Sequence, residues 1–119
     1  MTTAATSTKT FLALLRVIQK IDSEFPLQYA ICLGEIALDE GLSLTDLSLR
    51  TGMPLSTVSR IVGALSSHRQ RGVPYDLVKV SIVPEERRRK ELRLTPRGHD
   101  IIAVVEDILS QTRPERLRA

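Results

Sequence analysis

The chain of 119 residues is long enough for one domain, and its net charge is +3 with 42% hydrophobic residues. A domain of this size buries about two thirds of its unfolded surface, and the single Cys32 excludes an internal disulfide. No stretch is apolar over the roughly 18 residues of a membrane span, and the first residues lack the pattern of a secretory signal. The sequence therefore predicts a single soluble domain over residues 1–119, located in the cytoplasm.

Positive charge is concentrated in the middle of the sequence. Residues 1–53 hold four Lys and Arg against six Asp and Glu, residues 54–98 hold ten against four, and residues 99–119 hold three against four. A basic middle between slightly acidic ends is typical of a surface that meets phosphates, although a basic surface with no ligand is the plainer alternative. With two Phe, two Tyr and no Trp, the chain is poorly equipped to stack on single-stranded bases, which favours duplex DNA.

The first predicted helix follows a polar leader of eight or nine residues and covers about residues 9–22. Its apolar residues keep helical spacing and include a second flank: Phe11, Leu12, Leu14, Leu15, Val17, Ile18 and Ile21. A domain this small has little interior in which to surround a helix. The second flank therefore predicts contact with a partner chain, with deep burial as the alternative.

A second helix is predicted from Pro26, which suits a first helical position, to Glu40, with Gly41 ending it. Its helical stripe consists of Leu27, Ala30, Ile31, Gly34 and Leu38. Cys32 lies on this helix between apolar residues, so we expect a buried structural thiol, with a redox switch as the less favoured interpretation.

The next segment has the signals of a short helix followed by a tight turn. Ser43 can cap its N-terminus, and Asp46, three positions on, completes a capping box. Residues 44–51 contain neither Gly nor Pro, and Gly52 then predicts the turn.

The stretch from Gly52 to Ser66 predicts a helix suited to a DNA groove. Its apolar stripe consists of Val58, Ile61, Val62 and Leu65. The opposite face is small and polar, with Ser56, Arg60, Gly63 and Ser67 at its centre and Thr57 and Ser59 on its flanks. Two helices joined by a tight Gly-containing turn indicate a helix-turn-helix, while a plain helical hairpin remains the alternative at this point.

The following residues favour the helix-turn-helix because they predict a β-hairpin wing. After a polar loop at 66–76, residues 77–83 are rich in β-branched side chains, residues 84–88 form a turn, and residues 89–94 return with Leu92 and Leu94 on one face. Four consecutive cations lie at or just past the hairpin tip: Arg87, Arg88, Arg89 and Lys90. A charge run is usually just solvated, but on a wing these side chains can reach phosphates or a narrow minor groove.

Thr95 as N-cap and Pro96 at the first position open a last helix, predicted over 95–112 and ended by Pro114. It is strongly apolar through Ile101, Ile102, Val104, Val105, Ile108 and Leu109. The predicted fold is mainly α with a small β-hairpin wing: a winged helix-turn-helix whose DNA-binding core spans about 42–98. The helices at 9–22 and 95–112 are predicted to pair in a homodimer.

In its residues from about Leu42 to Gly98, the chain resembles the multiple-antibiotic-resistance regulator (MarR) family of winged-helix transcription factors. The resemblance rests on Leu42-Ser-Leu-Thr-Asp-Leu-Ser48, Ser56-Thr-Val-Ser-Arg60, Pro84-Glu-Glu-Arg-Arg88 and Leu94-Thr-Pro-Arg-Gly98. It implies a two-fold dimer that binds palindromic DNA, usually as a repressor, sometimes relieved by a small molecule or by thiol oxidation.

Other chemistry has little support in the sequence. His68 and His99 lack Cys or carboxylate at metal-ligand spacing, and no phosphate loop or nucleophile motif occurs. We therefore expect no metal, no cofactor and no enzymatic activity. The candidate DNA contacts are Ser56, Thr57, Ser59, Arg60, Arg87, Arg88, Arg89 and Lys90. The alternatives are a winged helix that binds protein and a DNA-binding winged helix of another family.

Overall fold

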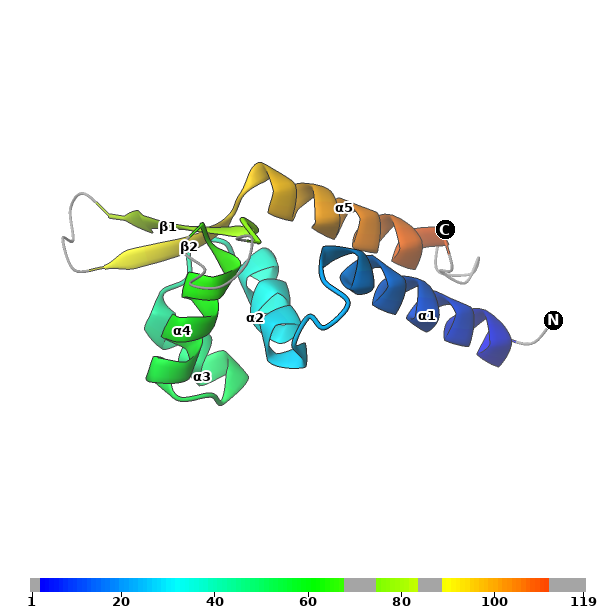
Figure 1. Cartoon of the computed structure of the whole chain (residues 1–119), viewed down its shortest axis with the longest axis horizontal. Coiled ribbons are helices and arrows are strands. Elements are labelled where there is room, and N and C mark those ends of the chain that lie inside the picture. The colour runs from blue at the N-terminus through cyan, green and yellow to red at the C-terminus, as the bar shows by residue number, and fades with distance from the viewer. Residues whose placement is uncertain (1–2, 68–74, 84–88, 112–119) are drawn as a thin grey trace, which may run out of the picture. The chain divides into compact units, whose positions relative to one another are not determined.

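A computed structural model describes residues 3–67, 75–83 and 89–111, and every structural statement below concerns these residues. The elements in chain order are α1 (Thr3–Ile21), α2 (Leu27–Leu38), α3 (Leu44–Thr51), α4 (Leu55–Leu65), β1 (Val78–Ile82), β2 (Lys90–Leu94) and α5 (Pro96–Gln111) (Figure 1). The predicted fold class, mainly α with one β-hairpin, is confirmed.

The chain forms two compact units. One is Pro26–His99, which we call the winged core, and the other combines Met1–Phe25 with Asp100–Ala119, which we call the terminal unit. Helix α5 begins in the winged core and continues into the terminal unit.

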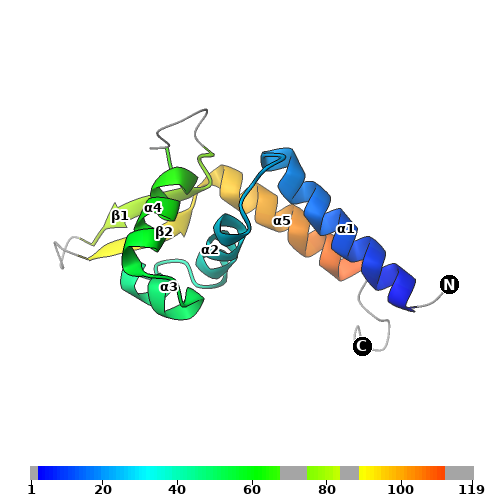
Figure 2. The same ribbon diagram turned by 60° about the horizontal axis from the view of Figure 1, so that its bottom comes forward.

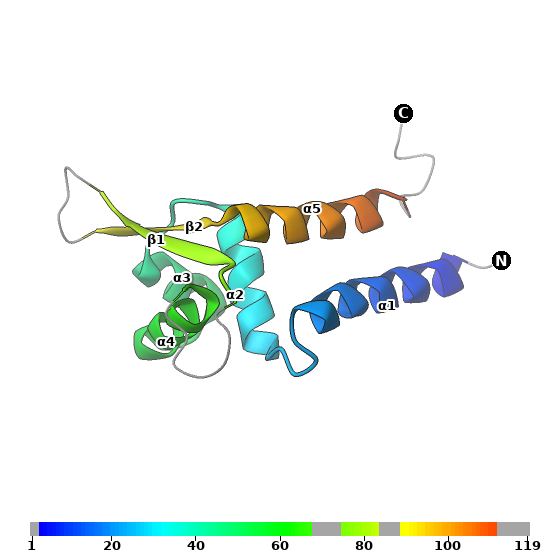
Figure 3. The ribbon, with the colours of Figure 1, turned by 45° about the horizontal axis from the view of Figure 1, so that its top comes forward.

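The winged core is built around three helices and the hairpin. Helix α2 contacts α3, α4 and β2, and α3 and α4 contact each other (Figure 2). Nine of its side chains are fully buried: Cys32, Ile36, Leu47, Val58, Ile61, Leu65, Leu77, Val78 and Leu92. Helices α3 and α4 both lie on the same side of the hairpin (Figure 3).

Strand β2 is hydrogen-bonded along both edges. Its antiparallel partner is β1, with Val78 opposite Leu94, Val80 opposite Leu92 and Ile82 opposite Lys90. On the other edge, the Leu92 amide donates to the Leu42 carbonyl (2.9 Å) and the Gly41 amide donates to the Leu92 carbonyl (2.8 Å). The segment before α3 thus anchors the base of the wing, while Ile82 near its outer end is 62% exposed.

Three sequence predictions about the first two helices are wrong. The polar leader of eight or nine residues is helical from Thr3, because residues 3–10 hold no Gly or Pro and the Thr10 hydroxyl donates to the Thr6 carbonyl within the helix (3.0 Å). Helix α2 ends at Leu38 instead of Glu40, and the Glu40 carboxylate accepts a hydrogen bond from the Leu94 amide (2.8 Å).

The third correction concerns the face of α2 that is buried. The predicted stripe is largely exposed, with Leu27 at 75% and Leu38 at 79%, whereas Cys32, Leu33 and Ile36 are buried. Helix α2 is apolar on several sides, so spacing alone selects no single stripe, and the contacts with α3, α4 and β2 decide which face is covered.

Candidate nucleic-acid interface

The turn between α3 and α4 fixes where α4 begins. Ser43 and Asp46 form the predicted capping box at the start of α3, and Gly52 ends α3 with φ of 74°, a left-handed conformation that favours glycine. The Ser48 hydroxyl donates to the Met53 carbonyl (2.6 Å). These local bonds hold the two helices as the helix-turn-helix that the sequence predicts.

Helix α4 divides into a buried and an outward face, as its sequence predicts. The four residues of its apolar stripe, Val58, Ile61, Val62 and Leu65, are buried. On the other side Ser56, Ser59 and Arg60 are exposed, and Thr57 is half-buried. Within the part of the chain that the structure describes, the Arg60 guanidinium makes no ion pair or hydrogen bond, so it is available to a partner.

The N-terminal end of α4 has two features that the sequence reasoning missed. Its N-cap residue is Pro54, which makes no side-chain cap, so the Leu55 and Ser56 amides that precede the first intrahelical bonds are left uncapped by a side chain. Leu55, the first residue of α4, is 49% exposed beside Ser56. Exposed apolar and amide groups at the start of such a helix can contact a thymine methyl group and a phosphate, respectively.

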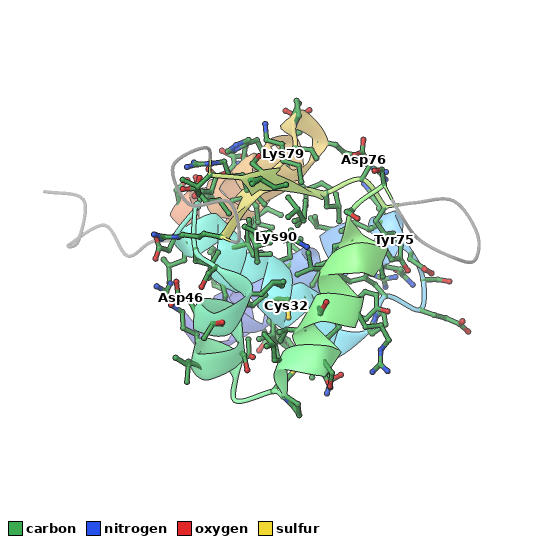
Figure 4. The ribbon with its side chains drawn as sticks, turned by 90° about the vertical axis from the view of Figure 1, so that its left-hand side faces the viewer. Cys32, Asp46, Tyr75, Asp76, Lys79 and Lys90 are labelled. Atoms are coloured by element: carbon green, nitrogen blue, oxygen red, sulfur yellow. The ribbon has the colours of Figure 1, made fainter. Side chains whose placement is uncertain are left out.

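The cations of the hairpin lie on different faces of it. Strand alternation places Lys90 on the face that carries Leu92 and Leu94, and Lys79 on the opposite face (Figure 4). Both lysines are exposed, as is Arg89, whose carbonyl accepts a hydrogen bond from the Val83 amide (3.1 Å). Lys79 was missed as a candidate, although its place on the polar face of the predicted strand was a usable signal.

The turn predicted at 84–88, with Arg87 and Arg88, lies outside the described residues, as do His68 and Pro114. Of the eight candidate contacts, the structure therefore places Ser56, Thr57, Ser59 and Arg60 together on α4, and Arg89 and Lys90 at the hairpin.

Several other basic side chains of the winged core are already engaged. Arg50 pairs with Asp39 (2.6 Å), Arg93 pairs with Glu91 (2.9 Å), and Arg97 donates to the Tyr75 carbonyl (2.7 Å). In the basic middle of the sequence, Arg93 and Arg97 are thus held by partners within the fold, so fewer of its cations are available to a partner than the charge count suggests.

The Asp46 carboxylate is held in its ionised form at the start of α3. Hydrogen bonds from Ser43, followed by the positive charges of Arg50 and Arg89, lower the pKa of Asp46. The positive charge of Arg89, at the outer end of the wing, thus acts on the Asp46 carboxylate of the capping box.

The junction between β2 and α5 is more tightly built than its sequence suggested. The Thr95 hydroxyl accepts from the Gly98 amide (3.0 Å), as predicted for an N-cap, and also donates to the Asp76 carbonyl (2.6 Å). Gly98 packs against the chain before β1, where a Cβ on Gly98 would lie 2.2 Å from the Leu77 carbonyl oxygen. Only glycine fits there.

The Cys and His side chains, which are the residues most suited to redox chemistry or metal binding, lie as follows. Cys32 is fully buried, and burial, followed by the charge of Glu35, raises its pKa to about 11. His99 lies at the surface with its Nε2 3.3 Å from the Glu40 carboxylate. The described residues contain no cluster of three or more His, Cys, Asp or Glu side chains that could bind a metal ion. In the same residues, no helix is both long and apolar enough to span a membrane.

Comparison with known proteins identifies the class of this arrangement. Residues 36–70, which contain α3 and α4, match the IclR helix-turn-helix domain. No curated protein sequence matches the chain. The chain therefore carries a helix-turn-helix domain, and its hairpin makes it a winged one.

Comparison with solved structures shows which winged-helix proteins have a similar fold. The chain is similar to MarR (TM-score 0.57, 22% identity) over 72% of its own length and 54% of the MarR chain. It is similar to MepR in the S. aureus MepR–DNA complex (TM-score 0.69, 18% identity), covering 88% of this chain and 79% of that one. It is also similar to Streptococcus pneumoniae FabT in complex with DNA (TM-score 0.59, 17% identity), covering 97% and 83%.

These similarities show the MarR-like winged-helix fold that the sequence motifs predicted. They agree with the sequence match on the helix-turn-helix and extend the likeness to the hairpin and the terminal helices. The chain spans about half the length of MarR.

Proposed function

We propose that this protein is a sequence-specific transcription regulator that binds double-stranded DNA. The observation that carries the proposal is the outward face of α4, on which Ser56, Ser59 and Arg60 are exposed over a fully packed apolar stripe. The match to a helix-turn-helix domain and the likeness to two DNA-bound regulators support this assignment.

In the proposed complex α4 lies in the major groove. Ser56, Thr57 and Ser59 supply short hydroxyl donors and acceptors, and Arg60 makes the single strong contact, two hydrogen bonds to the O6 and N7 of a guanine. Leu55 and the uncapped amides at the start of α4 lie beside them. The helix thus reads base edges.

The wing supplies charge in this proposal. Arg87, Arg88, Arg89 and Lys90 contact phosphates or enter a minor groove, and Lys79 is an additional candidate from the opposite face of the hairpin. Such contacts add affinity for any duplex and carry little sequence information.

The proposed assembly is a homodimer formed by the terminal unit. Large apolar side chains of α1 and α5 are exposed there, among them Phe11, Leu12, Leu15, Val104 and Leu109. Two copies of α4 about 34 Å apart would then bind a pseudo-palindrome with half-sites one helical turn apart. We propose that the dimer represses transcription by occupying such a site in the cytoplasm, without catalysis or a cofactor.

A protein-binding winged helix is the second candidate, favoured by one observation. Leu27, Leu38 and Leu49, all in the winged core, are each at least three-quarters exposed. Exposed apolar residues of this kind are typical of a protein partner's docking surface. The polar α4 and the basic hairpin favour DNA instead.

Selection of bound sequences from a pool of random duplex DNA tests the proposal. We expect enrichment of two inverted half-sites whose centres are about 10 base pairs apart. A salt titration on random duplex accompanies it, and the affinity should fall steeply as salt rises because phosphate contacts release counterions. If no sequence is enriched and binding to duplex is absent at low salt, the protein-binding alternative replaces the proposal.

A further inference from the structure

The outward face of α4 contains a half-buried glycine, Gly63, for which the described residues give no structural reason. Gly63 lies within α4, two residues before its end at Leu65, where glycine is a poorer helix former than alanine. Helices tolerate such a residue when it supplies a special backbone angle or a close contact. Neither reason applies to Gly63 within the described structure.

The backbone of Gly63 is ordinary. Among the described glycines, those with positive φ are Gly41 and Gly52, and Gly63 is not one of them. A Cβ added to Gly63 would meet no described atom within 4 Å, in contrast to Gly98, where it would meet a backbone oxygen. Alanine at position 63 would therefore fit the helix without displacing any described neighbour.

The position of Gly63 on α4 is the informative feature. At about 100° per residue, Gly63 follows Ser56 by seven residues and Arg60 by three, so all three share the outward face. The buried stripe lies on the other side. A methyl group on residue 63 would thus project from the surface that we propose faces DNA.

An α-helix with its side chains is about 10–12 Å across, nearly the width of the major groove, about 12 Å. Small residues on the groove side allow the helix axis to lie deeper, which shortens the distance that the Arg60 side chain must span. One added methyl on that side moves the helix outward or tilts it, and base contacts are sensitive to such shifts.

We propose that Gly63 is a specificity-determining positioning residue, which sets how deeply α4 enters the major groove. The inference rests on the proposed DNA-binding function. It adds Gly63, which has no side chain to bond a base, to the residues that determine specificity. It assigns to Gly63 a role that the helix alone leaves unexplained.

Gly34 provides a matched control within the same chain. It lies inside α2, has no positive φ, and its added Cβ would also meet nothing within 4 Å. It lies on α2, away from the outward face of α4. Alanine at either position should stabilise its helix in the protein without DNA, but only alanine at position 63 should weaken DNA binding.

The experiment measures the melting temperature and the DNA affinity of Gly63→Ala and Gly34→Ala. Both variants should melt about 2–5 °C above the wild type, because alanine favours the helix. Gly63→Ala should bind the duplex selected by the wild type at least about tenfold more weakly, a difference of about 1.4 kcal/mol, while its affinity for random duplex stays within about twofold. Gly34→Ala should bind both duplexes as the wild type does. Gly63→Leu should weaken selected binding further than Gly63→Ala.

Three results would overturn the inference. A lower melting temperature for Gly63→Ala would show that the fold needs this glycine. Unchanged binding of the selected duplex by Gly63→Ala would show that Gly63 does not set the depth of α4 in the groove. An equal loss of affinity in Gly34→Ala would show the same. If instead the wild type selects no duplex, the proposed function fails and this inference fails with it. That outcome is distinct from the three results above, because the two binding results require a duplex selected by the wild type and the melting result involves no DNA.

Discussion

The winged core and the terminal unit differ in how they bury apolar residues. Among the described residues, every buried hydrophobic side chain, from Cys32 to Leu94, belongs to the winged core. In the terminal unit the apolar residues of α1 and α5 are exposed or half-buried, and Phe11 is 60% exposed. The winged core therefore holds the buried apolar core while still exposing Leu27, Leu38 and Leu49, whereas the described terminal helices bury no hydrophobic side chain.

The winged core also contains backbone hydrogen bonds between segments distant in sequence. In the winged core, Gly41 and Leu42 bond to Leu92, the Leu77 amide donates to the Leu65 carbonyl, and the Thr95 amide donates to the Leu77 carbonyl. Such bonds fix one arrangement of helices and hairpin. The contrast teaches that similar apolar helical patterns can form a buried core in one unit and a largely exposed surface in the other, which we propose as the dimer interface.

The largest expected effect on the stability of a single chain tests the completeness of the winged core. Gly98→Ala should destabilise the protein by about 3 kcal/mol, because overpacking against a backbone carbonyl cannot be relieved by moving a side chain. Urea unfolding measures it, with Gly34→Ala as the control that adds the same methyl in open space. A Gly98→Ala variant as stable as the wild type would contradict the close packing of α5 on the chain before β1.

The next effect tests the availability of the terminal unit. Phe11→Asp should weaken self-association by about 1,000-fold, because each of the two protomers loses about 2 kcal/mol of apolar burial. Sedimentation should then show monomers at concentrations where the wild type is dimeric. Leu27→Asp, at an exposed apolar residue of the winged core, should leave the dimer intact. If Leu27→Asp dissociates the dimer and Phe11→Asp does not, the interface lies in the winged core and the account is contradicted.

A smaller effect concerns the buried thiol of the winged core. Cys32→Ser should lower the free energy of unfolding by about 2 kcal/mol, because it buries a hydroxyl group where the core is apolar. DNA affinity should not respond to peroxide in either protein, because a thiol with a pKa of about 11 holds little thiolate at neutral pH. Peroxide-dependent release of DNA by the wild type, lost in Cys32→Ser, would make Cys32 a redox switch.

The same thiol predicts a pH dependence of stability. In the unfolded chain Cys32 ionises near its ordinary pKa of 9.0, but in the folded protein only near 11. Unfolding therefore releases a proton in this range, so the wild type should lose stability as the pH rises from 9 to 11. Cys32→Ala should lack that part of the loss, and equal pH profiles for the two proteins would show that the thiol is not desolvated.

The smallest effect concerns the cap of α3. Ser43→Ala should cost about 1 kcal/mol, because it removes the side-chain acceptor for the Asp46 amide. The pKa of Asp46 is lowered in the folded protein, so its contribution is present above the unfolded pKa and is lost as the pH falls through the lower folded value. Asp46→Asn should therefore flatten the acid limb of the stability profile, and an unchanged acid limb would show that the capping box does not act through its charge.

Local signals predicted the helix-turn-helix closely. The cap at Ser43, the turn at Gly52 and the buried stripe of α4 are all as expected, because each depends on residues close in sequence. The hairpin was also found, from β-branched alternation on one strand and the Leu92 and Leu94 pair on the other.

Contacts between segments distant in sequence determine the features that the sequence patterns did not predict. The apolar stripe of α2 did not reveal its buried face, because Leu27, Ile31 and Leu38 are as apolar as the residues that α3, α4 and β2 cover, although the burial of Cys32 was predicted. The role of Gly98 was hidden because its neighbour, Leu77, is distant in sequence. Of the candidate site, the α4 residues followed from helical spacing, Lys79 could have been found from strand alternation, and Leu55 needed the observed exposure.

The most direct test of the central claim, that α4 reads bases while the wing supplies charge, compares Arg60→Ala with the double variant Arg87→Ala, Arg88→Ala. Each is titrated with the selected duplex and a random duplex across a salt series. Arg60→Ala should lose about 1–3 kcal/mol of discrimination while keeping most of its affinity for random duplex. The wing variant should weaken both duplexes alike and lower the slope of log K against log salt by about 0.9 for each phosphate that it no longer neutralises. Equal reductions in affinity for both duplexes with Arg60→Ala, or no reduction for either with the wing variant, would contradict the account.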